Sequence, residues 1–467
     1  MNLTQAGVVE LRRQIQARSI TSAQLVEALI ERTQAQAALN GYVAFDADAL
    51  RAQARDADAR IAAGETLPLL GVPIALKDNI DSVGLPSSAG TGALKGRAPA
   101  EDAEVVRRLR AAGALIAGKA NMHELAFGIT NNNAVTGAAH NPWDATRIPG
   151  GSSGGSGVVV AAGLVPAALG TDTGGSVRVP AALCGVVGLR PTVGRVSGRG
   201  IAPISTTRDT AGPIARSVAD CALLDSVLTG DNEALAIVSL EGVRLGLPRP
   251  YWDPIEPGVR EVMDAAVERL RAAGVEFVEL PMPRLFELAG GVGFPVALFE
   301  FVRDMTDYLR YANRGIDFRQ LVEGTGSPDV SGLAQSLLGA GAVPESVYQE
   351  ALKTRVQLQA LHADTFTSAG VQAMLFPTTP LTAAPIGQDE TVLFNGQQSP
   401  TFTTFIRNTD PGSNAGIPGV TVPAGLSGGL PVGLALDGPA GSDRALLALA
   451  AAIEAVLPPL PSAPWQR

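Results

Sequence analysis

Strand-like and helix-like segments alternate along this chain, and the alternation constrains its fold more than any other feature. A segment at 258–273 has the apolar spacing of an amphipathic helix and lies between strand-like runs at 243–247 and 275–280, the pattern of a β-α-β unit. Further strands are predicted at 72–76, 114–117, 167–169 and 186–189, and further helices at 101–112 and 217–228. The predicted fold class is α/β, with a central mixed, mostly parallel β-sheet covered by helices on both faces.

Residues 1–62 break this alternation and predict an N-terminal helical layer. Thr21 and Gln24 have the spacing of a capping box, and apolar residues then recur at helical intervals. No internal repeat or low-complexity linker divides the sequence. We therefore expect one domain over residues 1–467.

Two glycine-serine blocks carry the strongest chemical signal. Residues 150–157 read GGSSGGSG, and residues 170–176 read GTDTGGS. Successive glycines before a serine let the backbone bend tightly, so that several N–H groups can face one point beside the hydroxyl. Upstream, Lys77 follows an apolar run. Two hydroxyls and one amine could form a proton relay that needs no histidine.

The order Lys77, Ser152 and Ser176 resembles the amidase signature family, serine hydrolases that cleave carboxamides with a Ser-Ser-Lys triad. The phrases that carry the resemblance are GGSSGGS and GTDTGGSVRVPA. Similar family text is found at 118–128 (GKANMHELAFG), 141–144 (NPWD), 188–194 (GLRPTVG), 209–213 (DTAGP), 375–380 (LFPTTP) and 416–423 (GIPGVTVP). The resemblance extends across nearly the whole chain and implies the amidase signature fold, with its signature core at 63–230.

The resemblance also implies a role for each triad residue. Ser176 would be the nucleophile, and Lys77 would be the base that reaches it through a bridging serine, Ser152. The peptide bond before the bridging serine is cis in relatives. Burial would lower the pKa of Lys77 and supply a neutral amine. The oxyanion hole would be formed by the backbone N–H groups of Thr173, Gly174, Gly175 and Ser176.

Each triad residue has an ordinary structural alternative. A serine after two glycines often caps a helix, and a lysine at the end of a strand often reaches water. On sequence alone, Ser153 competes with Ser152 for the place of the relay residue. The functional interpretation is preferred because all three residues match the family together.

Five further residues match family positions near the site. Asp172 and Arg178 correspond to residues that brace the nucleophile loop by hydrogen bonds, and the alternative for them is a surface ion pair. Asn131, Asn132 and Asn133 are typical of the loop that reaches the substrate side of relatives, although asparagines are also common in turns. We predict a supporting role for the first pair and substrate contacts for the three asparagines.

Residues 286–345 break the strand-helix rhythm and are rich in aromatic side chains. These are Phe286, Phe294, Phe299, Phe301, Tyr308, Tyr311 and Phe318. We interpret the stretch as an insertion that lines the substrate pocket. The alternative is that the rings only pack helices onto the core.

Composition narrows the choice of partner. The net charge of -9 argues against a nucleic-acid partner and against attachment to anionic lipid. Charged residues within 10–13 lie where a signal peptide would need an apolar stretch. The apolar stretch at 158–169 is too short to span a membrane. Cys184 and Cys221 are too few for a disulfide framework. We expect a cytoplasmic protein without a membrane partner, and the sequence leaves a homodimer open.

Three other motifs are set aside. Residues 150–154 satisfy G-x-S-x-G, but no strand-like run precedes them, and only His362 comes late enough for that triad. The Gly-Lys pair at 118–119 lacks the Ser or Thr of a P-loop. The His-Glu pair at 123–124 lacks a second histidine four positions after the first. We predict an enzyme without a metal or a cofactor.

The leading hypothesis is hydrolysis of a small carboxamide to a carboxylate and ammonia, through an acyl-enzyme on Ser176. The phrase MHELAFGITNNN and the aromatic insertion resemble the branch of mandelamide and indoleacetamide hydrolases, which favours an aryl-acetamide substrate. One alternative is a glutamine-hydrolysing amidotransferase subunit, disfavoured because Val179 stands where its relatives have glutamine. Another is a catalytically silent binding protein on the same scaffold, disfavoured because all three triad positions are occupied.

Overall fold

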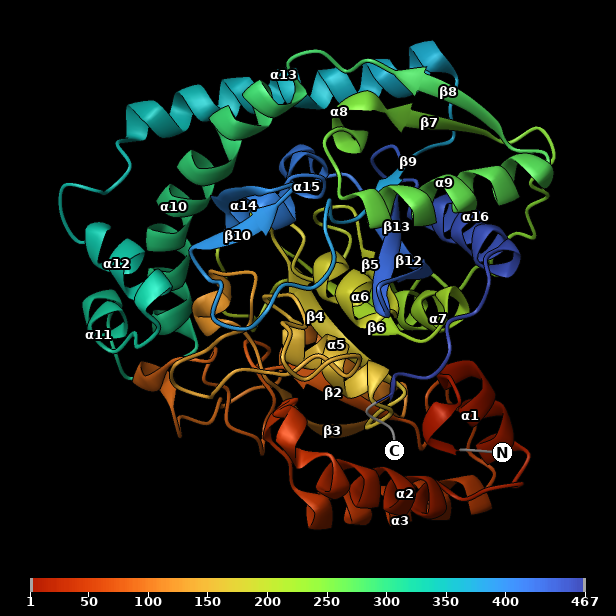
Figure 1. Cartoon of the computed structure of the whole chain (residues 1–467). Helices are drawn as coiled ribbons and strands as arrows, with labels where there is room; N and C mark the ends of the chain where they lie inside the picture. The colour runs from red at the N-terminus through yellow and green to blue at the C-terminus, as the bar shows by residue number, and fades with distance from the viewer. Residues whose placement is uncertain (1–2, 465–467) are drawn as a thin grey trace.

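The computed structural model describes residues 3–464 and contains one large β-sheet (Figure 1). The order of its eleven strands is β1-β3-β2-β4-β6-β5-β12-β13-β9-β7-β8. The strands are β1 (Tyr42–Ala44), β2 (Pro73–Lys77), β3 (Leu115–Ala120), β4 (Ala167–Asp172), β5 (Val187–Arg190), β6 (Thr210–Ala215), β7 (Arg244–Pro248), β8 (Glu276–Leu280), β9 (Ala373–Pro377), β12 (Gly419–Ser427) and β13 (Leu430–Asp437). A separate hairpin pairs β10 (Thr391–Phe394) with β11 (Gln397–Pro400). Every strand predicted from the sequence is present.

The sheet is mixed, as predicted, but mostly antiparallel. Six of its pairings are antiparallel and four are parallel, so the prediction of a mostly parallel sheet is wrong. One cause is the hairpin of β12 and β13, which pairs antiparallel with β5 on one side and with β9 on the other. Its two-residue turn places Gly428 and Gly429 at φ of 56° and 82°, which glycine adopts without steric cost.

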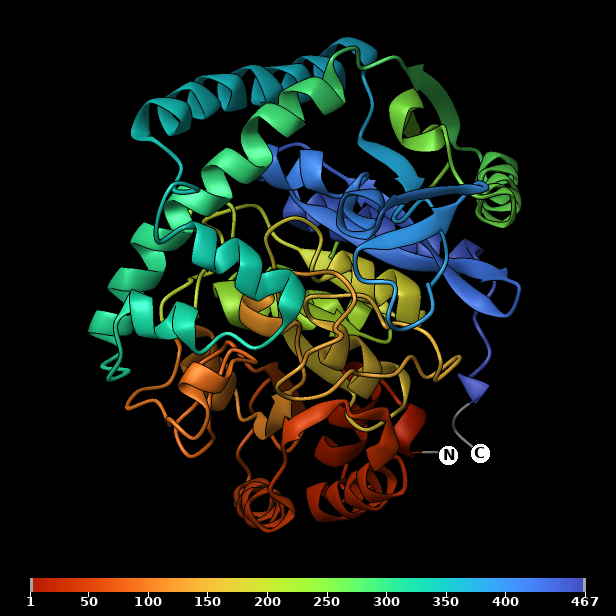
Figure 2. The same cartoon turned by 60° about the vertical axis from the view of Figure 1, so that its left-hand side comes forward.

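Helices lie on both faces of the sheet (Figures 1 and 2). The side chains of a strand point alternately to opposite faces. Along β2, Ile74 and Leu76 pack into the larger hydrophobic cluster with the helices at 104–111, 218–229 and 443–456. Ala75 packs into a second cluster with the helices at 47–62 and 154–161. The helices are α1 (Val8–Gln16), α2 (Ser22–Ala35), α3 (Ala47–Ala62), α4 (Glu104–Ala111), α5 (Gly154–Ala161), α6 (Arg178–Cys184), α7 (Val218–Thr229), α8 (Arg249–Trp252), α9 (Pro257–Ala272), α10 (Leu285–Tyr311), α11 (Phe318–Glu323), α12 (Pro328–Ser336), α13 (Glu345–Ala369), α14 (Thr401–Ile406), α15 (Asp410–Ala415) and α16 (Asp443–Val456). The predicted helix-covered α/β architecture is confirmed.

The N-terminal segment forms a helical layer at one end of the molecule (Figure 1). Thr21 and Gln24 make the predicted capping box, in which each side chain accepts a hydrogen bond from the other residue's backbone N–H. The same segment also supplies the edge strand β1, which the prediction missed because three residues are too few to show a strand period. The continuous sheet supports the single domain, which stays a prediction.

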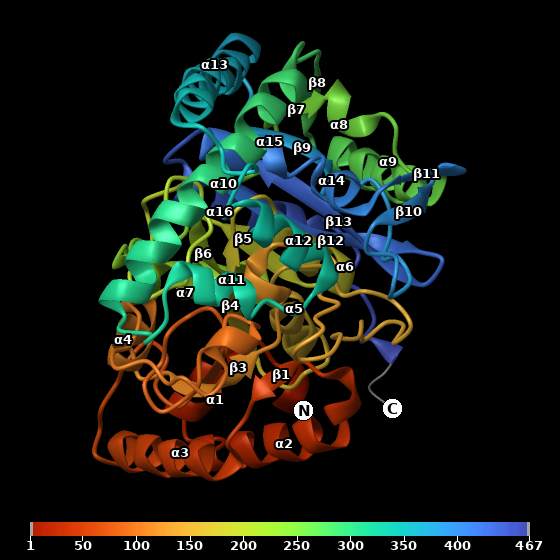
Figure 3. The ribbon, with the colours of Figure 1, turned by 90° about the vertical axis from the view of Figure 1, so that its left-hand side faces the viewer.

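The predicted insertion is helical. It contains α10, α11 and α12, and α10 packs along α13 on one side of the molecule (Figure 3). Within the described residues, α10 is the one helix whose length and composition would also suit a membrane span, and 50% of its apolar window is buried in the protein. This burial is typical of a core helix.

Candidate active site

Lys77 and Ser152 meet in the interior of the protein. Lys77 is the last residue of β2, and Ser152 lies two residues before the start of α5. Lys77 Nζ is 2.8 Å from Ser152 Oγ and 2.8 Å from Thr171 Oγ1. Both Lys77 and Ser152 are fully buried. The two residues that the sequence places 75 positions apart are therefore joined by a direct hydrogen bond.

Burial makes Lys77 a candidate base. Desolvation lowers its pKa from 10.5 to about 7, although Asp172 and Asp209 act in the opposite direction. The neighbouring carboxylate, Asp78, is bound instead by Ser88 and the N–H of Gly90. Within residues 3–464, the hydrogen-bond partners of the lysine are hydroxyl and carbonyl oxygens and none is a carboxylate.

The peptide bond between Gly151 and Ser152 is cis, as the family resemblance implied. The carbonyl of Ser152 accepts a 3.0 Å hydrogen bond from the N–H of His123. The competing residue Ser153 is occupied elsewhere, because its hydroxyl is 3.2 Å from both the carbonyl oxygen and the amide nitrogen of Thr171. Of the two serines, only Ser152 contacts Lys77.

Ser176 lies between β4 and α6 and lines a cavity, with 9% of its surface exposed. Its carbonyl accepts a 3.2 Å hydrogen bond from the N–H of Ser153. This bond ties the two glycine-serine blocks together through the residue that follows Ser152. Within residues 3–464 the Ser176 hydroxyl makes no hydrogen bond to Ser152 or Lys77, so the relay between the two serines stays a prediction. Ser176 is the triad residue whose hydroxyl can meet a ligand in the cavity.

The carbonyl groups of the loop before Ser176 are each held by a donor. Asp172 O accepts from Arg190, Thr173 O from Arg208, Gly174 O from Thr409, and Gly175 O from the N–H of Val179. A trans peptide points its C=O and its N–H in opposite directions. The N–H groups of Thr173, Gly174 and Ser176 therefore turn away from these donors, and none has an acceptor within residues 3–464.

The Gly175 amide differs from the other three. It donates a 2.9 Å hydrogen bond to Asp172 Oδ1, so it is already used within the loop. Of the four predicted oxyanion donors, Gly175 is thus the one whose N–H is engaged in the loop, and the oxyanion hole stays a prediction. The loop still requires glycine at position 175, where φ is 138°.

Asp172 and Arg178 form a buried brace rather than a surface ion pair. Arg178 Nε lies 3.1 Å from Asp172 Oδ2, and Arg190 Nη1 lies 2.9 Å from Asp172 Oδ1. All three side chains are almost completely buried. Burial would raise the pKa of Asp172, but Arg178 and Arg190 outweigh it and hold that pKa well below its usual range. The carboxylate therefore stays charged and holds the loop amides of Gly175 and Val177.

Sequence reasoning missed several residues of the site, among them Arg190 and Thr171. Arg190 was present in the family-like phrase GLRPTVG, but nothing in that phrase indicated its contact with Asp172. Thr171 precedes Asp172 and accepts hydrogen bonds from Lys77 Nζ and, at 3.1 Å, from Asn79 Nδ2. Its hydroxyl position beside Lys77 follows from the pairing of β4 with β2.

The three asparagines are engaged inside the protein. Asn131 Oδ1 accepts from the N–H of Gly154 at 3.0 Å, and Asn132 Nδ2 donates to Asp389 at 2.7 Å. Asn133 binds four backbone groups of the surrounding loops. The cavity at Ser176 is lined by other residues, so this geometry does not support the predicted substrate contacts.

The cavity at Ser176 has a volume of about 70 Å³ and is mostly apolar. Its wall is formed by Ala126, Phe127, Thr173, Gly174, Ser176, Ile204, Arg208, Gly293, Phe294, Ala297, Phe402, Ile406 and Asp410. The ring of Phe294 lies 5.9 Å from that of Phe402. A larger hollow of about 580 Å³ adjoins it and shares Ala126, Thr173 and Ile204.

The insertion contributes to this cavity through one segment of α10. Gly293, Phe294 and Ala297 line it, which supports the prediction that residues 286–345 form part of the pocket. Phe301 and Phe318 belong instead to a buried cluster that joins the insertion to Leu94 and Leu125. Both interpretations of the aromatic residues therefore apply, each to different rings.

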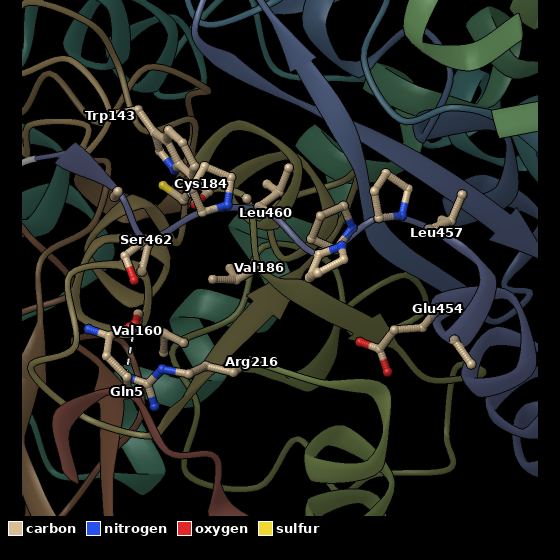
Figure 4. Close-up of a pocket in the computed structure, with 18 residues that line it drawn as sticks. Gln5, Trp143, Val160, Cys184, Val186, Arg216, Glu454, Leu457, Leu460 and Ser462 are labelled. Atoms are coloured by element: carbon tan, nitrogen blue, oxygen red, sulfur yellow. Dashed lines mark hydrogen bonds between the residues drawn. The ribbon is translucent and has the colours of Figure 1, made fainter. Parts of the chain in front are cut away.

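A separate cavity of about 490 Å³ lies elsewhere in the molecule (Figure 4). It is lined by Trp143, Cys184, Leu460 and other residues, and it contains none of the predicted triad residues. Arg216 on its wall donates to backbone carbonyls, including that of Val160 at 3.2 Å. Within residues 3–464, no group of three or more His, Cys, Asp or Glu is placed to hold a metal ion, and the metal-free enzyme stays a prediction.

Comparison with known proteins agrees with this geometry. The family model named Amidase matches residues 24–447. An indoleacetamide hydrolase of Rhizobium radiobacter is 45% identical over 434 residues, which cover 92% of each chain. A mandelamide hydrolase of Pseudomonas putida is 43% identical over 475 residues, covering 98% of this chain and 91% of its own.

The fold is shared with solved enzymes. A protein described as an amidase in its crystal structure superposes with a TM-score of 0.86 at 35% identity, covering 97% of this chain and 100% of its own. A family match over most of the chain and relatives above 40% identity both identify the protein as an enzyme that hydrolyses amides. The chain belongs to the amidase family.

Proposed function

We propose that this amidase converts the primary amide of an aryl-acetic acid into the free acid and ammonia, through an acyl-enzyme on Ser176. The observation that supports the proposal most directly is the 2.8 Å hydrogen bond from Lys77 Nζ to Ser152 Oγ, at a buried lysine whose pKa is about 7. An amine with this pKa can accept a proton near neutral pH. The two relatives described above are named for hydrolysis of aryl-substituted amides.

In the first step, neutral Lys77 takes the hydroxyl proton of Ser152, and Ser152 takes that of Ser176. The Ser176 oxygen then attacks the amide carbon. The negative charge that develops on the carbonyl oxygen would be stabilised by the N–H groups of Thr173, Gly174 and Ser176. Loss of one such donor typically costs about 10²- to 10³-fold in kcat.

In the second step, the proton returns from Lys77 through Ser152 to the amide nitrogen. The C–N bond breaks, ammonia leaves, and the acyl group stays on Ser176 as an ester. Water then attacks the ester while the relay takes its proton. The carboxylic acid is released, and Ser176 regains its hydroxyl proton through Ser152.

The chemistry of the cavity wall supports an aromatic acyl group. Phe127, Phe294 and Phe402 surround the space beside Ser176, and Ile204 and Ile406 complete an apolar wall. Aromatic rings in such a pocket gain both from burial and from ring-to-ring contact. A small aryl-acetyl group is the substrate part that this wall fits best.

The test is ammonia release from phenylacetamide, indole-3-acetamide and aliphatic amides. We expect release by the native protein and losses of at least about 10³-fold in Lys77→Ala and Ser176→Ala. Lys353→Ala and Ser368→Ala serve as controls, because both side chains lie on the exposed surface of α13. Full activity in either site variant would refute its assigned role.

The two alternatives have their own tests. A glutamine-hydrolysing subunit would release ammonia from glutamine faster than from aryl-acetamides, and Val179, fully buried in an apolar cluster, offers no polar group for that substrate. A silent binding protein would leave Ser176 unlabelled by a fluorophosphonate. Stoichiometric labelling of Ser176 would exclude it.

Three further expectations from the sequence complete the proposal. We propose a cytoplasmic enzyme that acts on a free small-molecule amide, without nucleic acid or membrane as partner. The acidic net charge of -9 supports this choice of partner. A homodimer stays open, and sedimentation of the purified protein would decide it.

A further inference from the structure

One carboxylate lies in the wall of the mostly apolar cavity beside Ser176. It belongs to Asp410, the first residue of α15. The Asp410 side chain keeps 18% of its surface exposed, whereas the Arg208 guanidinium bound to it keeps 4%. Both residues line the cavity, and a larger fraction of the Asp410 side chain than of the Arg208 side chain is accessible.

The Asp410 oxygens have acceptor capacity to spare. Oδ1 accepts a 2.7 Å hydrogen bond from Arg208 Nη2, and Oδ2 accepts a 2.7 Å hydrogen bond from Asn414 Nδ2. A carboxylate can accept about four hydrogen bonds. A ligand that excludes water from this cavity would leave the remaining acceptor positions unsatisfied unless it carried a donor.

The charge around Asp410 favours a neutral donor over a cation. Arg208 already neutralises the carboxylate, and its guanidinium is held by the carbonyls of Thr173 and Gly293 as well as by Asp410. A cationic ligand would lie close to this immobile positive charge. An N–H or O–H without formal charge satisfies Asp410 without that repulsion.

Asp410 also lies against the loop proposed to hold the oxyanion. A Cβ atom added to Gly174 would come within 3.0 Å of Asp410 Oδ1, and one added to Gly293 within 3.2 Å of Oδ2. Glycine at both positions leaves the carboxylate uncovered on these two sides. A donor on the acyl part of a substrate bound at Ser176 can therefore reach it.

We propose that Asp410 determines specificity by accepting a hydrogen bond from a neutral donor on the acyl group, such as a ring N–H or an α-hydroxyl. The inference rests on the proposed function and deepens it. The preferred substrates are aryl-acetamides that carry such a donor. Aryl-acetamides of the same shape without a donor are poorer substrates.

The first test compares two substrates of nearly equal shape on the native enzyme. Indole-3-acetamide carries a ring N–H, and benzofuran-3-acetamide has an oxygen in its place. We expect kcat/KM to be about 10- to 100-fold higher for the indole compound, the range given by a hydrogen bond to a charged acceptor. Equal kcat/KM values would overturn the proposal without any variant.

The second test assigns the preference to Asp410. In Asp410→Ala the ratio of the two kcat/KM values should fall toward 1, and in Asp410→Asn, which keeps one acceptor oxygen, it should be intermediate. Phe402→Leu is the matched control, because it changes the same cavity without a polar group and should keep the native ratio. A native ratio in Asp410→Ala, or loss of the ratio in Phe402→Leu, contradicts the role of Asp410.

Failure of the proposed function can be told apart from failure of this inference. If the native enzyme hydrolysed neither amide, the proposed function would be wrong. Calorimetry of the two amides with Ser176→Ala would then test the inference on binding alone. Tighter binding of the indole compound supports the acceptor role of Asp410, and equal affinity overturns it.

Discussion

Thr409 Oγ1 donates a 2.7 Å hydrogen bond to the carbonyl oxygen of Gly174, 235 residues earlier in the chain. The bond sets the plane of the peptide between Gly174 and Gly175 and directs the Gly175 N–H to Asp172. A residue from the C-terminal part of the chain thus holds the loop that carries Ser176. This loop geometry depends on contacts that its own sequence does not contain.

Removing the Thr409 hydroxyl should disturb the loop that carries Ser176 without leaving a cavity in the core. Thr409→Val keeps the side-chain volume but deletes the donor to Gly174. We expect kcat to fall about 10-fold with little change in KM, because the N–H groups proposed to hold the oxyanion lose their alignment. Steady-state kinetics on phenylacetamide give kcat and KM separately and so test this expectation. Thr403→Val, at an exposed position of α14, should leave both constants unchanged, and an unaltered kcat in Thr409→Val would contradict this role.

Glycine at position 175 is required by both conformation and space. Its φ is 138°, and an added Cβ would lie 2.2 Å from Thr409 Oγ1. Gly175→Ala should therefore abolish fluorophosphonate labelling of Ser176 and lower the Tm.

Gly290 in α10 is the matched control for this substitution. It has no heavy atom within 4 Å of an added Cβ. Gly290→Ala should keep full labelling and raise the Tm slightly, because alanine favours the helix. Normal labelling in Gly175→Ala would show that the loop tolerates a second conformation.

The rate should depend on the protonation of Lys77. Burial lowers its pKa to about 7, and the relay needs the neutral amine, so activity should decrease as the pH falls through about 7. The pH profile of kcat/KM should show this acidic limb and a plateau at alkaline pH. A flat profile down to pH 5, with the chemical step shown to limit turnover, would contradict Lys77 as the base.

The buried lysine should also lower stability. Its pKa is about 7 in the folded protein and near 10.5 when solvated, so the unfolded chain binds a proton that the folded protein does not over this interval. Stability attributable to Lys77 therefore decreases as the pH falls from about 10.5 to about 7 and is constant below.

Lys77→Met should remove the free-energy cost of keeping the lysine buried. We expect the free energy of unfolding to rise by about 1–4 kcal/mol at pH 7 and by less at pH 10. Urea unfolding at the two pH values measures the difference. Lys353→Met, at an exposed position, should show no such pH-dependent gain. A gain in Lys77→Met that is equal at both pH values would argue against a depressed lysine pKa.

Local sequence was sufficient to single out Lys77, Ser152 and Ser176 as candidates and to predict six of the described strands. Glycines around Ser152 and Ser176 prescribe tight backbone turns, and an apolar run before Lys77 prescribes a buried strand. These are properties of a few neighbouring residues. They explain why the buried amine and the β-α-β unit agree with the prediction, whereas the cis bond before Ser152 was implied only by the family resemblance.

The rest of the fold and of the candidate site depends on contacts between segments that lie far apart in the sequence. The sheet is mostly antiparallel because β12 and β13 insert between β5 and β9 and because β1 and β6 also pair antiparallel with their neighbours, an order that strand periodicity does not encode. The hydrogen bond from the Gly175 N–H to Asp172 and the internal hydrogen bonds of Asn131–Asn133 could likewise not be predicted from the local sequence. Arg190, Thr409 and Asp410 reach the site from other elements, and their hydrogen bonds form only when β5 and the start of α15 pack against the loop before Ser176. Features determined by residues that are neighbours in the sequence could therefore be predicted from the sequence alone. Features determined by contacts between distant segments could be found only in the folded structure.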